Sequence, residues 1–83
     1  MRVTVKYFAS IREAIGVSSE SLHTAAATLA TLRDELIAAG GERGRCLARG
    51  CAVRMALDQV LTEETAALHD GAEVAFFPPV TGG

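Results

Sequence analysis

The sequence ends with Phe76-Phe77-Pro78-Pro79-Val80-Thr81-Gly82-Gly83, which joins the end of an apolar strand to two prolines and two glycines. Pro78 and Pro79 have no backbone N–H group and fix their φ angles, so they end strand pairing after Phe77 and keep the next residues extended. We therefore expect a folded domain over residues 1–77 and an extended tail over residues 78–83.

This tail suits a chemical role for its terminal carboxyl group. Its extended reach is roughly 20 Å, which is enough to enter the active site of a partner protein. Gly82 and Gly83 have no side chains, so a narrow channel can admit them and a reagent can approach the carboxyl group. A carboxylate is a poor electrophile, and another enzyme would have to activate it as a mixed anhydride with AMP. These features indicate a carrier, whereas the plain alternative is a terminus without chemistry.

Strand patterns lie at both ends of the expected domain. Asp70-Gly71 is a turn signal, and the apolar segment 73–77 that follows it predicts a strand. Near the start, Val3, Val5 and Tyr7 alternate with polar residues, which predicts a half-buried strand. A helical crossover separates the two strands, so we expect them to pair in parallel at the centre of one sheet.

A short helix and an edge strand are expected after the first strand. Ser10 and Glu13 have the spacing of a capping box, which predicts a helix that Gly16 closes. Its inner face would contain Ile11, Ala14 and Ile15. The polar segment 19–23 predicts an edge strand.

The central part of the sequence predicts the main helix. Thr28 is a suitable N-cap, and Gly40-Gly41 supplies a stop. The inner face would contain Leu29, Leu32, Leu36 and Ile37. We expect a loop over the polar residues 42–50, a strand in which Val53, Met55 and Leu57 alternate, a turn at Asp58-Gln59 and a brief strand at Val60-Leu61.

Together these elements predict an α+β fold of the ubiquitin-like β-grasp type. The expected architecture is a mixed sheet of about five strands with one main helix packed on one face. The alternation of side chains along the last strand implies that only one of Phe76 and Phe77 points into the core. The other ring is then a candidate anchor for a partner protein.

Composition limits the classes of function. The chain has 83 residues, 49% of them hydrophobic and 22% charged, which is typical of one globular domain. A net charge of −2 gives no field for nucleic acid or an anionic membrane. No export signal precedes the first strand and no apolar run approaches the length of a membrane span, so we expect a cytoplasmic protein.

The other chemically active side chains do not form a recognisable site in the sequence. Cys46 and Cys51 would form a disulfide only in an oxidising compartment, and we expect two structural thiols. A zinc site is disfavoured because only His23 and His69 could complete four ligands. We expect both histidines in surface or capping roles. The remaining charged groups are expected on solvated faces, although the arginines could contact an acidic partner or an anionic substrate: Arg43, Arg45, Arg49, Arg54 and Glu63-Glu64.

Three segments make the chain resemble the small subunit of molybdopterin synthase, the MoaD-like sulfur carriers. These segments are Phe8-Ala9-Ser10-Ile11-Arg12-Glu13, Asp70-Gly71-Ala72-Glu73-Val74 and Phe77-Pro78-Pro79-Val80-Thr81-Gly82-Gly83. The resemblance covers essentially the whole chain, and the ending is its most diagnostic part. Such carriers often have a second acidic residue where this chain has Ala72, and residues 40–52 match only loosely.

The resemblance implies a function that several proteins share. An ATP-dependent adenylyltransferase similar to ubiquitin-activating enzymes would adenylate Gly83, and a sulfur donor such as a cysteine desulfurase would convert the adenylate into a thiocarboxylate. The tail would then enter the large catalytic subunit, and two loaded carriers would supply the dithiolene sulfurs of molybdopterin. The implied assembly contains two small and two large subunits. This chain would bind no cofactor, because the activating enzyme uses the ATP.

The resemblance also assigns roles to individual tail residues. Gly83 would carry the sulfur, and Gly82 would fit the channel that leads to it. The implied partner-binding residues are Phe76, Phe77, Pro78, Pro79, Val80 and Thr81.

Three other functions are compatible with the same ending. Gly83 could form an isopeptide bond with lysines of other proteins, as in ubiquitin-like modifiers, although Lys6 is the only lysine available for building chains of this protein. The chain could also carry sulfur for thiamin thiazole synthesis, although such carriers are typically shorter and lack the Phe-Pro-Pro approach. A non-covalent β-grasp binding module would leave the tail chemically idle.

Overall fold

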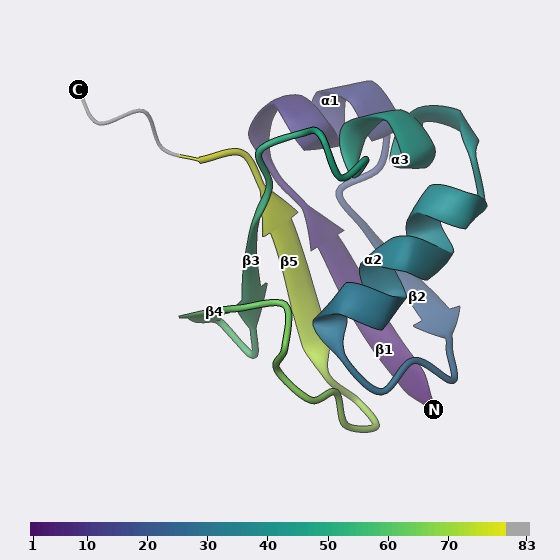
Figure 1. The fold of residues 1–83 in the computed structure, drawn as a ribbon, viewed down its shortest axis with the longest axis vertical. Helices are drawn as coiled ribbons and strands as arrows, with labels where there is room; N and C mark the ends of the chain where they lie inside the picture. Colours follow the sequence, from purple (N-terminus) through teal and green to yellow (C-terminus); the bar gives the residue numbers. More distant parts are fainter. Residues whose placement is uncertain (80–83) are drawn as a thin grey trace.

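The computed structural model describes residues 1–79. Five strands and three helices follow one another along the chain (Figure 1). Their bounds are β1 Arg2–Tyr7, α1 Ala9–Ile15, β2 Ser19–His23, α2 Leu29–Ala38, α3 Gly41–Cys46, β3 Arg54–Leu57, β4 Val60–Thr62 and β5 Glu73–Phe77. None of the helices in this part of the chain has the length and apolar character that a membrane span requires.

The strands form one mixed sheet in the order β2-β1-β5-β3-β4. β1 and β5 are parallel neighbours at its centre, whereas the other neighbouring strands are antiparallel. The predicted central pairing and the predicted edge position of β2 are therefore confirmed. The sheet has the ubiquitin-like β-grasp topology, with the N-terminus and the C-terminal end of β5 at opposite ends of the molecule (Figure 1).

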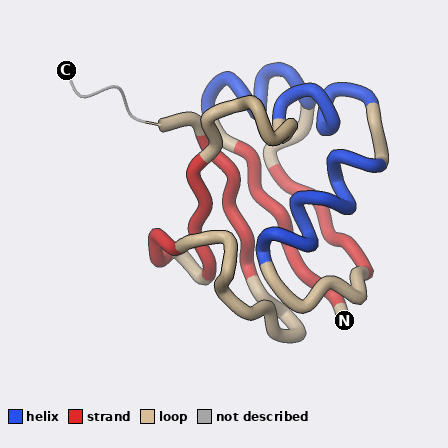
Figure 2. The backbone as a smooth tube through the Cα atoms, viewed as in Figure 1, coloured by secondary structure: helices blue, strands red, loops and turns tan. Residues whose placement is uncertain are grey.

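The core lies between the sheet and the helices, which cover one face (Figure 2). Alternation along the central strands sends Val3, Val5 and Tyr7 of β1 into this core, together with Val74 and Phe76 of β5. Helix α2 adds the buried apolar side chains of Leu29, Leu32 and Leu36. The opposite face of the sheet has no helix over it within residues 1–79.

Helix α1 begins differently from the capping-box prediction. The N-cap is Phe8, whose side chain forms no capping bond, and Ser10 already lies inside the helix. Ala9 begins the helix with a φ of 51°, in the left-handed region that disfavours side chains. Gly16 closes the helix with a φ of 93°, as predicted. Ala14 is exposed, so the predicted inner face is reduced to Ile11 and the half-buried Ile15.

Helix α2 follows the prediction, but the predicted loop after it is wrong. The Thr28 hydroxyl accepts a hydrogen bond from the Thr31 backbone N–H at 3.3 Å, as expected of the N-cap. Gly40 and Gly41 have φ angles of 78° and 63°, so they turn the chain, and α3 begins at Gly41. A Cβ atom at Gly44 would lie 3.0 Å from the Ile37 carbonyl oxygen, so glycine permits the close approach of α3 to α2.

Two turns lie at the end of the sheet that is opposite the tail. Asp58 and Gln59 both have positive φ angles, of 51° and 69°, and they join β3 to β4 as predicted. Gly71 has a φ of 83° in the turn that precedes β5. The predicted turn signals therefore coincide with backbone that most side chains disfavour.

Candidate functional site

The root of the tail is the end of the central strand β5. Phe77 is the last strand residue, and Pro78 and Pro79 follow it as half-buried residues without regular structure. The remaining predicted site residues lie outside the described residues: Val80, Thr81, Gly82 and Gly83. The structure therefore shows where the tail begins, and the chemistry of its tip stays a prediction.

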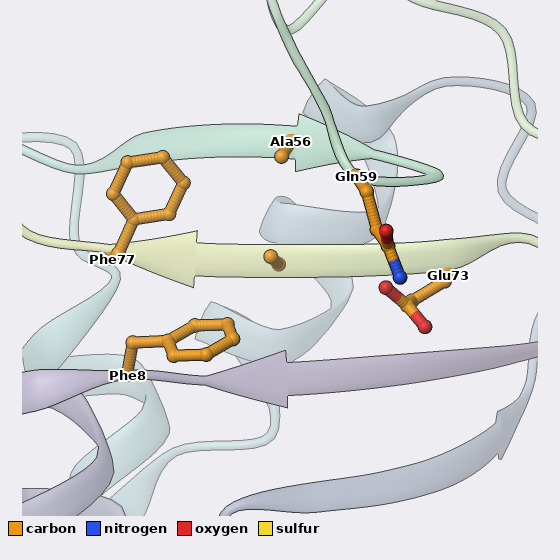
Figure 3. A pocket seen from close by; sticks show the side chains of 6 residues that line it. Phe8, Ala56, Gln59, Glu73 and Phe77 are labelled. Atoms are coloured by element: carbon orange, nitrogen blue, oxygen red, sulfur yellow. The ribbon is translucent and has the colours of Figure 1, made fainter.

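Phe76 and Phe77 point to opposite faces of the sheet. Phe76 is 0% exposed and stacks on Tyr7, with ring centroids 6.3 Å apart and planes inclined by 19°. Phe77 is only half-buried and lies on the face that lacks helices (Figure 3). The expectation that one ring enters the core is confirmed, and Phe77 is the ring that a partner can contact.

Phe77 belongs to an apolar surface on this face. A shallow depression of about 420 Å³ is lined by Phe8, Ala56, Gln59, Glu73, Ala75 and Phe77. Its apolar part, here named the open-face patch, consists of Phe8, Ala56, Ala75 and Phe77. Figure 3 shows the two phenylalanine rings at one end of the depression, with Gln59 and Glu73 at the other. The patch is therefore contiguous with the root of the tail.

Phe8 is a member of the patch that the sequence prediction of site residues missed. It is 46% exposed, although it directly follows the buried Tyr7. Its backbone N–H donates to the Phe76 carbonyl oxygen at 3.2 Å, which continues the β1–β5 pairing for one more residue. Continuing the alternation of β1 through position 8 would have placed this ring on the open face.

Charged side chains border the open-face patch. The Lys6 ammonium group lies 3.2 Å from a Glu73 carboxylate oxygen, so this pair links β1 to β5 beside the apolar residues. Arg54 is directly opposite Phe77 in the β3–β5 register and is exposed. A partner that covers the patch would therefore meet a positive charge at the edge nearest the tail.

A buried arginine that the sequence analysis did not single out organises the segment after α3. Arg33 is 5% exposed. Its guanidinium group donates to the carbonyl oxygens of Leu47 at 2.7 Å, Ala48 at 2.9 Å and Cys51 at 3.3 Å. It also forms a 2.8 Å ion pair with Glu64. Arg33 therefore connects α2 to the segment that precedes β3 and to the segment that follows β4.

The expectation that Glu64 is merely solvated is wrong. Its carboxylate accepts hydrogen bonds from both Arg33 and Arg49. Burial alone would raise the pKa of Glu64, but these two guanidinium groups outweigh it and hold the pKa below its usual value. Arg49 also contacts Asp34 at 2.8 Å. Arg33, Arg49 and Glu64 therefore form a network of ion pairs with a structural role.

Arg43 also has a structural role. Its guanidinium group donates two hydrogen bonds to the Glu20 carboxylate, at 2.7 and 2.9 Å. The Tyr7 hydroxyl donates a hydrogen bond to the same carboxylate at 2.5 Å. Burial of Tyr7 and, as a smaller effect, this hydrogen bond raise the pKa of Tyr7. The predicted arginine group is thus divided: Arg43, Arg45 and Arg49 pair with acidic residues of the chain itself, whereas Arg54 is exposed on β3.

The histidines and cysteines do not form a catalytic group. His23 contacts the Arg2 guanidinium group at 2.7 Å, and His69 contacts Asp58 at 2.6 Å. The hydrogen bond with Asp58 raises the pKa of His69. Cys46 and Cys51 are free thiols. Over residues 1–79, no three His, Cys, Asp or Glu side chains gather in a way that could hold a metal ion.

Comparison with known proteins covers nearly the whole chain. Residues 5–83 match the profile described as the ThiS family. A molybdopterin synthase sulfur carrier subunit of Haemophilus influenzae is 38% identical over 81 residues, which cover 98% of this chain and 99% of that protein. A protein of the same name from Escherichia coli is 36% identical, with the same coverage of both chains.

A solved structure shows a similar chain bound to another protein. The complex of subunits 1 and 2 of the molybdopterin-converting factor from Helicobacter pylori contains a chain that is 27% identical to this one. The match covers 100% of both chains with a TM-score of 0.70.

Proposed function

The chain belongs to the ThiS family, and on that premise we propose that it is the sulfur carrier subunit of a molybdopterin synthase. The observation that carries this proposal is the similarity of 36–38% identity, from end to end, to proteins of that name. The structure supports it because the central strand β5 ends at Phe77, which belongs to an exposed apolar patch, so the tail begins beside that patch.

The proposed reaction takes place on the carboxyl group of Gly83. A carboxylate oxygen attacks the α-phosphate of ATP on a separate adenylyltransferase, which releases pyrophosphate and leaves an acyl adenylate. The outer sulfur of a persulfide on a donor such as a cysteine desulfurase then displaces AMP and gives an acyl disulfide. A thiol cleaves its S–S bond, which releases the thiocarboxylate and leaves the donor in a disulfide with that thiol. This chain contributes the carboxyl group and the presentation of the tail, while ATP and the catalytic groups belong to the other proteins. It is therefore a subunit of a sulfurtransferase without a catalytic site of its own.

The open-face patch is the surface that we assign to docking. Phe77 lies at the root of the tail and Phe8 lies beside it, so a partner that covers both rings also receives the residues that follow Pro79. Such exposed aromatic side chains are typical anchors of protein interfaces. The large synthase subunit and the adenylyltransferase would use this surface in turn, which requires a reversible interface.

The proposed assembly consists of two small and two large subunits. The Helicobacter pylori complex shows that a similar chain binds a second subunit. Two loaded carriers supply the two dithiolene sulfurs, after which each tail returns as a carboxylate for another cycle. We place the assembly in the cytoplasm, because free thiols such as Cys46 and Cys51 are typical of a reducing compartment.

The direct test is the intact mass of the protein recovered from its native cell, with fragmentation to locate any change. Replacement of one oxygen by sulfur at Gly83 is the expected result. A chain without Gly83 should remain unmodified, while Cys46→Ser and Cys51→Ser variants should still be loaded under reducing conditions. Full formation of molybdopterin by the carrier that lacks Gly83 would overturn the proposal.

The same experiment, followed by assays of molybdopterin and thiazole synthesis, separates the alternatives. An isopeptide remnant that joins Gly83 to a lysine of another protein, without any thiocarboxylate, would make the chain a protein modifier. A thiocarboxylate that supports thiazole synthesis and not molybdopterin synthesis would make it a carrier for thiamin. A tail that is never modified would leave only a binding module.

A further inference from the structure

The two cysteines, for which the proposed function has no use, face one cavity at the root of the tail. This cavity has a volume of about 280 Å³ and is lined by Ser10, Ile11, Cys46, Cys51, Ala52 and Pro78. Its walls therefore come from α1, from the end of α3, from the segment before β3 and from the first residue after β5. Cys46 is half-buried and Cys51 is exposed, so a reagent in solution can reach the site through Cys51.

One hydrogen bond bounds the distance between the Cys51 sulfur and the Cys46 backbone. The Cys51 Sγ atom donates to the Arg45 carbonyl oxygen at 3.4 Å. That carbonyl group is bonded to the nitrogen of Cys46, so standard bond lengths place Cys51 Sγ within about 6 Å of the Cys46 Cα atom. The two cysteines of a disulfide have Cα atoms about 4.4–6.8 Å apart. This bound joins the sulfur of Cys51 to the Cα atom of Cys46, so closure of a bond requires that the two Cα atoms come within the disulfide range and that the side-chain rotamers change.

The segment between the cysteines is held in this shape from inside the protein. The buried Arg33 donates to three of its carbonyl oxygens, those of Leu47, Ala48 and Cys51. The Cys51 N–H also donates to the Ala48 carbonyl oxygen at 2.8 Å, which turns the chain back toward α3. The proximity of the thiols is thus built into the fold and does not depend on a mobile loop.

From this arrangement we propose that Cys46 and Cys51 form a dithiol site that reacts with small-molecule disulfides and closes into an intramolecular disulfide. The Cys51 thiolate attacks one sulfur of the reagent, its S–S bond breaks, and one thiolate leaves. Cys46 then attacks the mixed disulfide at Cys51 and releases the second thiolate. The protein loses two electrons and two protons, and the reagent is reduced to two thiols.

The environments of the two thiols favour this order of events. Exposure makes Cys51 the first nucleophile. Burial, together with the nearby Glu42 carboxylate, raises the pKa of Cys46, so little of it is thiolate before the mixed disulfide brings an electrophile beside it. Because Pro78 lines the same cavity, the new bond would form against the first residue of the tail.

Oxidised glutathione is the appropriate probe, applied to the reduced, folded full-length chain. Trypsin cleaves after Arg45, Arg49 and Arg54, which leaves Cys46 in residues 46–49 and Cys51 in residues 50–54. A disulfide is then the only link between the two peptides. We expect the intact chain to lose two hydrogens and the linked pair to exceed glutathione adducts by about tenfold.

Matched variants test each step of the reaction. Cys46→Ser should stop at a glutathione adduct on Cys51, because it lacks the second thiol. Unfolding in urea should abolish the preference for the linked pair, and Arg33→Lys, checked for folding by circular dichroism, should weaken it while the adducts increase. Adducts on both cysteines of the folded protein without the linked pair, or linked pairs only between two chains, would overturn the proposal.

Discussion

The two faces of the sheet differ in what their aromatic side chains do. On the helix-covered face, Tyr7 and Phe76 stack in the core with almost no exposure. On the open face, Phe8 directly follows β1 and Phe77 is the last residue of β5, and both remain accessible. Because side chains alternate along an extended chain, consecutive residues at the ends of β1 and β5 can serve stability and recognition separately.

The largest effects on stability and binding are expected when Phe76 and Phe77 are each replaced by alanine. Phe76→Ala removes a fully buried ring and should lower the free energy of unfolding by about 3–5 kcal/mol. Phe77→Ala removes a half-buried ring and should lower it by only about 1 kcal/mol. Binding to the large subunit should weaken at least about tenfold in the Phe77 variant.

Urea unfolding gives the first quantity and calorimetric titration of the large subunit gives the second. Ala75→Ser, a polar change within the same face, serves as a control for stability. Equal losses of stability in the two phenylalanine variants would contradict the division between the faces.

The second prediction concerns the buried guanidinium group of Arg33 in α2. Arg33→Met leaves three backbone carbonyl oxygens without their donor and removes one partner of Glu64, which should cost about 3 kcal/mol of unfolding free energy. Arg54→Met, on the exposed edge beside Phe77, should change stability by no more than about 0.5 kcal/mol. Parallel urea titrations measure both. A tolerated Arg33→Met substitution would show that the network is not needed for the fold.

The third prediction uses the acid sensitivity of the Glu20 contact. Hydrogen bonds from Arg43 hold the pKa of Glu20 below its ordinary value of 4.5, against the opposing effect of burial. A carboxyl group with a lowered folded pKa contributes stability above the unfolded value and loses that contribution as the pH falls through the folded value. Glu20→Gln should therefore cost about 1 kcal/mol at neutral pH and progressively less below pH 4.5.

Unfolding in urea at pH 7, 5, 4 and 3 checks this dependence. The exposed Glu13→Gln in α1 is the matched control for removal of a surface carboxylate and should change stability by no more than about 0.5 kcal/mol at pH 7. A Glu20→Gln difference that stays the same down to pH 3 would mean that the carboxylate charge does not stabilise the protein.

The smallest predicted effect is a gain of stability next to the patch. Gln59 has a φ of 69° in the β3–β4 turn, which glycine adopts without a steric penalty. Gln59→Gly should therefore raise the free energy of unfolding by about 0.5–1 kcal/mol. Binding of the large subunit should be unchanged, because Gln59 borders the patch without belonging to it. Gln59→Ala is the control and should not raise the free energy of unfolding. Reduced binding of the large subunit by Gln59→Gly would mean that the docking surface extends to this turn.

The sequence was most informative where structure is set by local patterns. The period of two along β1 and β5 located the core residues, and the proline pair located the end of β5. The Thr28 cap and the leucines after it located α2. In each case the pattern covers one turn or a few strand residues, so no distant contact was needed to interpret it.

The features that the sequence did not predict depend on contacts between distant residues. Helix α3 contains Gly41 and Gly44 and has no fully buried residue, so its propensity and periodicity are weak, and contacts with α2 and Glu20 hold it. Arg33 resembles any surface arginine until the carbonyl groups of residues 47–51 surround it. Within the candidate site, Phe77 and Pro78 were predicted, whereas Phe8 was missed because the alternation of β1 was not continued past Tyr7.

The central position of β5 has a consequence for biosynthesis. The strand lies between β1 and β3, both of which are translated before it, and neither has its central neighbour until β5 has left the ribosome. Contacts between such distant segments form late and slowly. Folding of this sheet must therefore wait until β5 has emerged from the ribosome, and a chain interrupted before β5 lacks the central strand that joins β1 to β3. Only molecules that have acquired the root of the tail can reach a partner in folded form.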